Sequence, residues 1–134
     1  MNIIFLNILP VVVVATIPIF VGYIWYSKML FGKIWMKYSG DGADNGSMLN
    51  KIVVSYITYF LMAYVLAILL NYLVIASIIP AIILGTLVWL GFVVPTVASG
   101  YIWSSNKPAK LFLIQVSSFL ISFILMSISL SYWI

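Results

Sequence analysis

The chain alternates four long apolar stretches with short polar connections. The apolar stretches cover residues 3–26, 52–73, 78–101 and 111–131, and none of them contains a charged side chain. A helix needs about 20 apolar residues to cross a hydrocarbon core about 30 Å thick, and each stretch meets that requirement. This pattern predicts an all-α integral membrane protein, a single domain with four transmembrane helices arranged as two tandem hairpins.

The connection between the first two stretches contains a shorter amphipathic pattern. Its apolar side chains recur at positions i, i+3, i+4 and i+7, namely Phe31, Ile34, Trp35 and Tyr38. Lys33 and Lys37 lie on another face of the same helix. Such a helix can lie at the head-group boundary while the lysine stems reach toward water and phosphate. We therefore predict an interfacial amphipathic helix over residues 29–38, followed by a flexible polar loop over residues 39–50.

The composition agrees with this class, because 66% of the residues are apolar and only 6% are charged, far from the values of soluble proteins. The chain contains neither cysteine nor histidine, which leaves no thiol nucleophile and no ligand set for zinc or copper. The acidic pair Asp41 and Asp44 does not form a calcium loop, because Ala43 and Ile52 occupy positions where oxygen ligands belong. We expect no catalytic residue, no metal and no cofactor; the residual alternative is a lipid-acting enzyme that uses a serine or a lysine.

All charged side chains fall in two of the connections. The first connection holds Lys28, Lys33, Lys37, Asp41, Asp44 and Lys51, and the third holds Lys107 and Lys110. Because short loops that carry lysine stay on the cytoplasmic side, we predict a multi-pass protein of the cell (plasma or inner) membrane with both termini outside. The candidate contacts for anionic lipid are Lys28, Lys33, Lys37, Lys107 and Lys110. Lysines that only set the topology of the chain would give the same pattern.

The segment GYIW occurs twice, at residues 22–25 and 100–103, each time at the predicted cytoplasmic end of a span. A proline precedes each copy, Pro18 and Pro95, and is expected to kink its span. The repeat is open to two interpretations, an internal duplication or the independent use of Trp and Tyr at membrane interfaces. In either case we expect the glycines to allow close packing and the aromatic side chains to fix the depth of the helices. The expected interface anchors are Trp25, Tyr26, Trp35, Tyr101 and Trp103.

Uncharged polar side chains form stripes along the later spans. In the fourth stretch they follow a helical spacing on one face, which carries Gln115, Ser118, Ser122 and Ser129. The third stretch has Thr96 and Ser99 on one face, and the second has Asn71 at the end of a face of small residues. Small and hydroxyl residues of this kind let spanning helices approach closely and bond to one another. The stripes therefore indicate either plain helix packing or a polar path that accepts a neutral or weakly polar molecule.

The chain contains three segments in this order, GYIWYSKMLFGKIW, WLGFVVPT and KPAKLFLI. With them it resembles, over essentially its whole length, a mainly bacterial family of four-span membrane proteins, the domain-of-unknown-function family seventeen sixty-one. The matching positions are Trp25, Tyr26, Ser27, Leu30, Phe31, Gly32, Lys33, Trp35, Gly91, Phe92, Pro95, Lys110, Leu111 and Phe112. The resemblance implies a multi-pass protein of the cell membrane and carries over no catalytic residue, substrate or cofactor.

Two functional hypotheses follow from these patterns. The preferred one is a non-enzymatic, homo-oligomeric four-helix bundle that binds or passes a small neutral or weakly polar molecule. The alternative is an accessory or interaction protein whose lysine-rich, aromatic cytoplasmic face binds a partner protein or anionic lipid. Membrane lipid and further copies of the chain are the expected partners, and nucleic acid is not.

Overall fold

The computed structural model describes residues 8–27, 30–39, 48–103 and 109–133, and every regular element within these ranges is a helix. The elements in chain order are α1 (Ile8–Val14), α2 (Ile17–Trp25), α3 (Gly32–Ser39), α4 (Met48–Tyr72), α5 (Ile78–Val88), the π-helical turn η2 (Trp89–Val93), α6 (Val94–Ile102) and α7 (Ala109–Trp133). They form four helical segments long and apolar enough to cross a membrane: Ile8–Trp25, Leu49–Tyr72, Ile78–Ile102 and Ala109–Tyr132. The chain is thus an all-helical, multi-pass membrane protein, as its apolar stretches predict.

Both prolines that precede the GYIW segments coincide with an irregularity in their span. The first span is interrupted at Thr16 between α1 and α2, and Pro18 lies in the first turn of α2. The interruption follows from the missing N–H of Pro18, and the hydroxyl of Thr16 donates to the backbone oxygen of Val13 over 2.6 Å. In the third span the π-helical turn η2 comes directly before α6, whose first turn contains Pro95.

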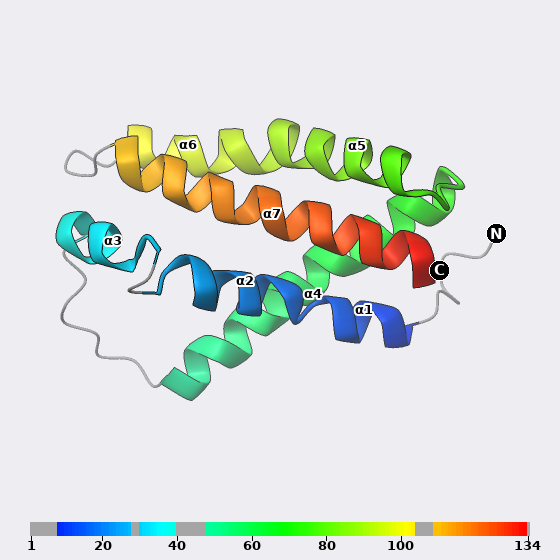
Figure 1. Ribbon diagram of the computed structural model, residues 1–134, viewed down its shortest axis with the longest axis horizontal. Coiled ribbons are helices and arrows are strands. Elements are labelled where there is room, and N and C mark those ends of the chain that lie inside the picture. Colours follow the sequence, from blue (N-terminus) through cyan, green and yellow to red (C-terminus); the bar gives the residue numbers. More distant parts are fainter. Residues whose placement is uncertain (1–7, 28–29, 40–47, 104–108, 134) are drawn as a thin grey trace.

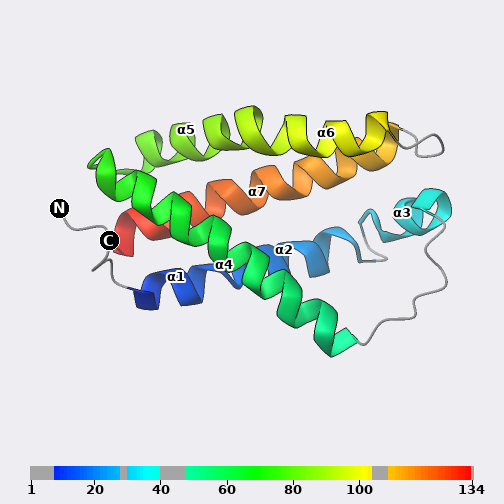
Figure 2. The ribbon, with the colours of Figure 1, turned by 180° about the vertical axis from the view of Figure 1, so that it is seen from behind.

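The last helix, α7, is the common packing partner of the fold. It contacts each of the other described elements, and it is the most buried of the four spans. Figure 1 shows α7 between α5–α6 on one side and α1–α2 on the other, all running along the long axis of the molecule. Helix α4 instead crosses the others obliquely, which is clearest from behind (Figure 2).

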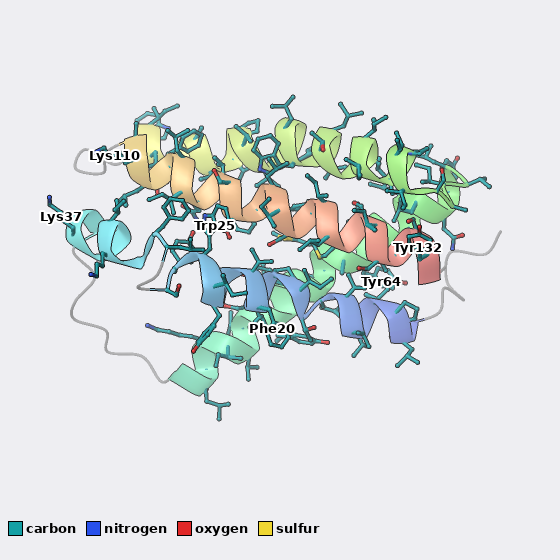
Figure 3. All side chains as sticks on the ribbon, viewed as in Figure 1. Phe20, Trp25, Lys37, Tyr64, Lys110 and Tyr132 are labelled. Atoms are coloured by element: carbon teal, nitrogen blue, oxygen red, sulfur yellow. The ribbon has the colours of Figure 1, made fainter. Side chains whose placement is uncertain are left out.

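The oblique path of α4 divides the bundle into two halves. An apolar core fills the half in which the second part of α4 packs against α1, α5 and α7. It consists of Val11, Val14, Ala15, Ala63, Leu66, Ala67, Leu70, Ala81, Phe123, Met126 and Leu130. The first part of α4 diverges from α6 and α7 toward the other end of the bundle (Figure 2). This other end carries Lys37 and Lys110 (Figure 3), and we call it the lysine-bearing end. The described chain begins and ends at the opposite end (Figure 1).

The closest helix contact in the core lies between Gly85 on α5 and Ser127 on α7. A Cβ atom at Gly85 would stand 2.5 Å from Ser127 Oγ and 3.0 Å from the backbone oxygen of Phe123. Only glycine fits this distance, so α5 and α7 approach with almost no side chain between them. Small residues perform this function in many membrane helix pairs.

The close packing predicted for the glycines of the two GYIW segments is wrong. A Cβ atom added at Gly22 or at Gly100 would meet no atom within 4 Å. Both residues face open space because their spans contact α7 through other side chains. Gly85 performs the packing role that the sequence analysis assigned to them.

We predict that Gly85→Ala lowers the free energy of unfolding by about 1–3 kcal/mol, because the added methyl group overpacks the α5–α7 contact. Gly100→Ala is the matched control, and it is expected to be neutral or stabilising by up to about 1 kcal/mol, since alanine favours the helix. Unfolding of both variants by SDS in mixed micelles, followed by circular dichroism, measures the difference.

A second change tests the cause of the Gly85→Ala effect. Ser127→Gly in the same chain removes the Oγ atom and the Cβ atom that crowd the new methyl group, so it is expected to restore part of the lost stability. Equal stability of Gly85→Ala and Gly100→Ala would show that the α5–α7 approach is not tight.

Candidate functional site

A polar pocket of about 270 Å³ lies between α2, α4 and α7. It is lined by Pro18, Gly22, Tyr26, Tyr59, Gln115, Ser118, Phe119 and Ser122. Five of these side chains offer a hydroxyl or an amide group, which is unusual for the interior of a membrane protein built mainly from apolar residues. At 1.5 Å per residue, the pocket extends along α7 from about 9 Å to about 20 Å beyond Ala109, so it reaches from near the lysine-bearing end to about the middle of a bilayer.

The chain that follows α2 brings Tyr26 into this pocket. After Trp25 the backbone turns back on itself, and the N–H groups of Phe31 and Gly32 donate to the backbone oxygens of Trp25 and Ser27 at 3.0 Å and 2.9 Å. A Cβ atom at Gly32 would clash with the backbone oxygen of Tyr26, so this turn requires glycine. The rings of Trp25 and Phe31 pack with their centroids 5.1 Å apart, which holds the turn against the end of α2.

Hydrogen bonds connect the two GYIW regions with α7 at the pocket. Tyr26 and Ser118 both line the pocket, and the hydroxyl of Tyr101 donates to Gln115 Oε1 over 3.1 Å. Ser122 Oγ donates to the backbone oxygen of Ser118 over 3.0 Å. These bonds fix the orientation of the Gln115 side chain, because its oxygen is held by Tyr101.

Two polar groups of the pocket remain without a partner in the described part of the chain. The side-chain nitrogen of Gln115 makes no hydrogen bond there, and neither does the hydroxyl of Tyr59. Both side chains are half-buried and line the pocket, and a hydrocarbon environment offers no hydrogen-bond partner for such groups. The pocket therefore suits a molecule that forms hydrogen bonds with both the Gln115 side-chain nitrogen and the Tyr59 hydroxyl.

The pocket is uncharged at neutral pH. Its polar groups are phenol, serine hydroxyl and primary amide groups, none of which ionises near pH 7. A charged ligand would lose its hydration in the membrane and gain no counter-charge from the residues that line the pocket. The lining accordingly fits an uncharged molecule.

An apolar groove of about 750 Å³ adjoins the polar pocket. It lies between α4 and the η2–α6 region, with α7 at its base, and Gln115 and Phe119 line both the groove and the pocket. The other residues of the groove are Leu61, Met62, Val65, Leu66, Leu69, Val88, Phe92, Val93, Thr96, Val97 and Phe123. Of these, only Thr96 carries a polar group, and its hydroxyl donates to the backbone oxygen of Phe92.

Two tryptophans hold α7 in place beside these cavities. Trp25 Nε1 donates to the backbone oxygen of Ile114 over 3.0 Å, and Trp89 Nε1 donates to that of Val116 over 2.7 Å. The first and the third span thus bind neighbouring carbonyl groups of α7, on either side of Gln115 in the sequence. Figure 3 shows Trp25 between α2 and α7, toward the lysine-bearing end.

The structure brings together only part of the predicted polar stripe. Gln115, Ser118 and Ser122 line the pocket, whereas Ser129 lies two turns farther along α7, where it is half-buried. Thr96 lines the apolar groove instead. The remaining two stripe residues line neither cavity: Ser99 is exposed on α6 and Asn71 is half-buried near the end of α4.

The predicted interface anchors have different surroundings. Trp25, Tyr26 and Tyr101 are partly buried and bonded as described above, but Trp103 is 88% exposed. The side chain of Trp35 lies outside the described residues, as do Lys28 and Lys107. The other lysines proposed as lipid contacts are exposed: Lys33, Lys37 and Lys110.

Tyr59 is the one polar pocket residue that the sequence analysis did not name. It stands within the apolar second stretch, in the segment SYITYF, and its role depends on the angle at which α4 crosses α7. A sequence signal was present, because a phenol hydroxyl inside a spanning helix normally requires a hydrogen-bond partner.

Residues 9–131 match the family described as "Protein of unknown function (DUF1761)". No curated protein and no solved structure matches the chain. The family match confirms the resemblance that the three sequence segments predict, and it covers both cavities.

We predict that Trp25→Phe and Trp89→Phe each lower the free energy of unfolding by about 1 kcal/mol, because each removes an indole N–H from a carbonyl group of α7. Trp103→Phe is the matched control. Its side chain is exposed, so a change of less than about 0.5 kcal/mol is expected. SDS titration of the three variants gives the comparison, and equal losses for Trp25→Phe and Trp103→Phe would contradict a specific role for the bond to Ile114.

Proposed function

The chain belongs to the DUF1761 family, and on that premise we propose that it is a non-enzymatic membrane protein that binds a small, uncharged molecule in the polar pocket beside α7. The observation that carries the proposal is the pair of unpartnered groups, the Tyr59 hydroxyl and the Gln115 amide nitrogen, at a pocket within the spans. A ligand with a hydrogen-bond acceptor such as a carbonyl, ester or hydroxyl oxygen satisfies both groups.

Binding is a better account of this pocket than catalysis. General acid–base chemistry at neutral pH is carried out most often by His, Asp, Glu or Lys at the reacting atoms. The lining of the pocket offers phenol, serine hydroxyl and amide groups instead, whose ordinary pKa values lie far from 7. Of its two serines, Ser122 donates its hydroxyl to the backbone of its own helix. The pocket holds hydrogen-bonding groups in fixed positions, and such an arrangement is suited to binding a specific ligand.

We also propose that the protein is a homo-oligomer. The third span is the least buried of the four, and its outward side chains include the exposed Leu87, Leu90 and Phe92. This face is available to a neighbouring copy within the membrane. Phe92 also borders the apolar groove, so an oligomer formed there would bring its interface next to the ligand site.

The arrangement of the chain in the membrane is part of the proposal. We place the lysine-bearing end at the cytoplasm and α3 at the head-group boundary, where the exposed Lys33 and Lys37 reach lipid phosphate. The two pairs of consecutive spans then form the tandem hairpins, with both termini outside. Anionic lipid is the expected partner of this face.

The lysine-bearing end also supports a second candidate function, an accessory protein that binds a partner protein or anionic lipid. The exposure of Lys33, Lys37 and Lys110 at one end of the bundle favours it. The two functions differ in the residues on which they depend. Ligand binding requires Tyr59 and Gln115, whereas partner binding requires the lysines.

We predict that the protein released gently from its own membrane retains one uncharged small molecule per chain, and that Tyr59→Phe and Gln115→Leu each reduce its occupancy at least about tenfold, the equivalent of about 1.4 kcal/mol. Native mass spectrometry measures the retained mass and the number of subunits together. A defined homo-oligomer is expected.

Tyr72→Phe is the matched control for Tyr59→Phe, because Tyr72 lies on the same helix with 69% of its surface exposed. This variant is expected to retain the molecule. An empty wild-type protein would contradict ligand binding, and a foreign polypeptide or anionic lipid alone on a monomer would favour the accessory function.

The orientation is testable with single cysteines, because the chain has none of its own. Ala76 and Ala109 are exposed. Ala76 lies in the connection between α4 and α5 and Ala109 begins α7, and Figure 1 shows the α4–α5 connection and the start of α7 at opposite ends of the bundle. In right-side-out membrane vesicles we expect Ala76→Cys to react with a membrane-impermeant maleimide, and Ala109→Cys to react only after permeabilisation. The reverse pattern would show that the lysine-bearing end faces outward.

A further inference from the structure

The polar pocket and the apolar groove meet at Gln115 and Phe119, which line both. A molecule bound to the Gln115 amide therefore lies next to the groove. The two cavities together combine one hydrogen-bonding part with one larger hydrocarbon part. This continuity carries an inference about the ligand that rests on the proposed function and deepens it.

The groove itself recognises hydrocarbon. The only polar side chains along it are Gln115, at its junction with the pocket, and Thr96, whose hydroxyl is engaged with the backbone of its own helix. Leu61 and Phe92 stand at its sides and are 61% and 72% exposed. The groove therefore opens to the acyl region of the bilayer, from which a hydrocarbon chain can enter laterally.

Ordinary phospholipids fit this pair of cavities poorly. The pocket extends from about 9 Å to about 20 Å along α7 from its start, so a phosphate group at its deeper end, beside Ser122, would lie within the hydrocarbon core. Neither cavity is lined by a lysine, so a buried phosphate would have no counter-charge. The head group that fits is uncharged and small enough for about 270 Å³.

A helix from a second copy also fits poorly. Spanning helices pack closely where small residues face one another, whereas bulky side chains such as Leu61, Met62 and Phe92 border the groove. Such a helix would also leave the Tyr59 hydroxyl in the neighbouring pocket without a partner.

We infer that the ligand is an uncharged, single-chain amphiphile, whose oxygen-bearing head occupies the polar pocket and bonds to Tyr59 and Gln115 while its hydrocarbon chain lies in the groove between α4 and η2–α6. The protein thus binds a neutral lipid from within the membrane, with the head held deeper than the surrounding phospholipid heads.

The test uses a monooleoylglycerol with a diazirine in its acyl chain, bound to the full-length protein in phosphatidylcholine nanodiscs and activated by light. Peptide mapping by mass spectrometry is expected to place the label on residues 61–69 of α4 and on residues 88–97. An excess of unlabelled monooleoylglycerol is expected to reduce labelling at least about tenfold. The short-chain monobutyroylglycerol and the charged lysophosphatidylglycerol are each expected to reduce it less than about twofold.

Two valines on α4 supply matched variants that leave the polar pocket intact. Val65→Phe fills the groove, which Val65 lines, and is expected to reduce labelling at least about fivefold. Val53 is exposed to a similar degree but lines neither cavity, so Val53→Phe is expected to have no effect. Thermal unfolding of both variants checks that they fold equally well.

The outcomes separate this inference from the proposed function. Equal competition by monobutyroylglycerol would overturn the hydrocarbon part and leave small-molecule binding in place. Equal competition by lysophosphatidylglycerol would overturn the requirement for an uncharged head. The inference as a whole would be overturned if labelling were absent, spread over all lipid-facing helices or unchanged in Val65→Phe. The proposed function is decided separately, by the molecule retained in native mass spectrometry and its loss in Tyr59→Phe.

Discussion

Every other described element packs against α7, and in a bilayer this packing has to arise from close fit and hydrogen bonds, since lipid tails compete on equal terms for apolar surface. The structure supplies both. Gly85 brings the backbone of α5 against Ser127, and Trp25 and Trp89 bind carbonyl groups of α7 from the first and the third span. These fixed points lie at different heights, so α7 is held along much of its length and presents Gln115, Ser118 and Ser122 in a defined orientation.

The pocket exists because α4 does not follow the direction of the other spans. Along its second part, Ala63 and Ala67 are completely buried and allow α4 to approach its neighbours closely. Before these alanines, α4 carries large aromatic side chains: the rings of Tyr56 and Phe60 pack at a tilt with centroids 6.5 Å apart, and the Tyr56 hydroxyl donates to the backbone oxygen of Val12 over 2.7 Å. Large residues at one end and small ones at the other incline the helix. The pocket is bordered on α4 by Tyr59, toward the diverging first part of the helix, whereas the groove runs along residues 61–69 of α4.

The sequence predicted the helical class, the four spans and the family, because these depend on apolar length and on local motifs. It also predicted Gln115, Ser118 and Ser122 as one face of a helix, since their spacing fixes that face whatever its neighbours are. It did not predict Tyr59 or the groove, because both depend on the crossing angle of α4, which is set by packing among residues far apart in the chain. The role assigned to Gly22 and Gly100 was wrong for the same reason: a glycine permits close approach, but only the tertiary arrangement decides whether another helix is there.

The two GYIW segments show how position relative to α7 decides the role of a short motif. Their tryptophans differ completely, since Trp25 binds a carbonyl group of α7 whereas Trp103 is almost fully exposed. Their tyrosines differ as well, because Tyr23 is exposed and Tyr101 bonds to Gln115. Yet each region contributes one hydroxyl to the same polar cluster, Tyr26 from just beyond the first copy and Tyr101 from within the second. Tyr101 occupies the oxygen of Gln115 and leaves its nitrogen available. The shared feature of the two regions is thus a tyrosine beside the polar face of α7. The bond from Tyr101 makes the amide at the junction of the two cavities a donor ready for an uncharged ligand.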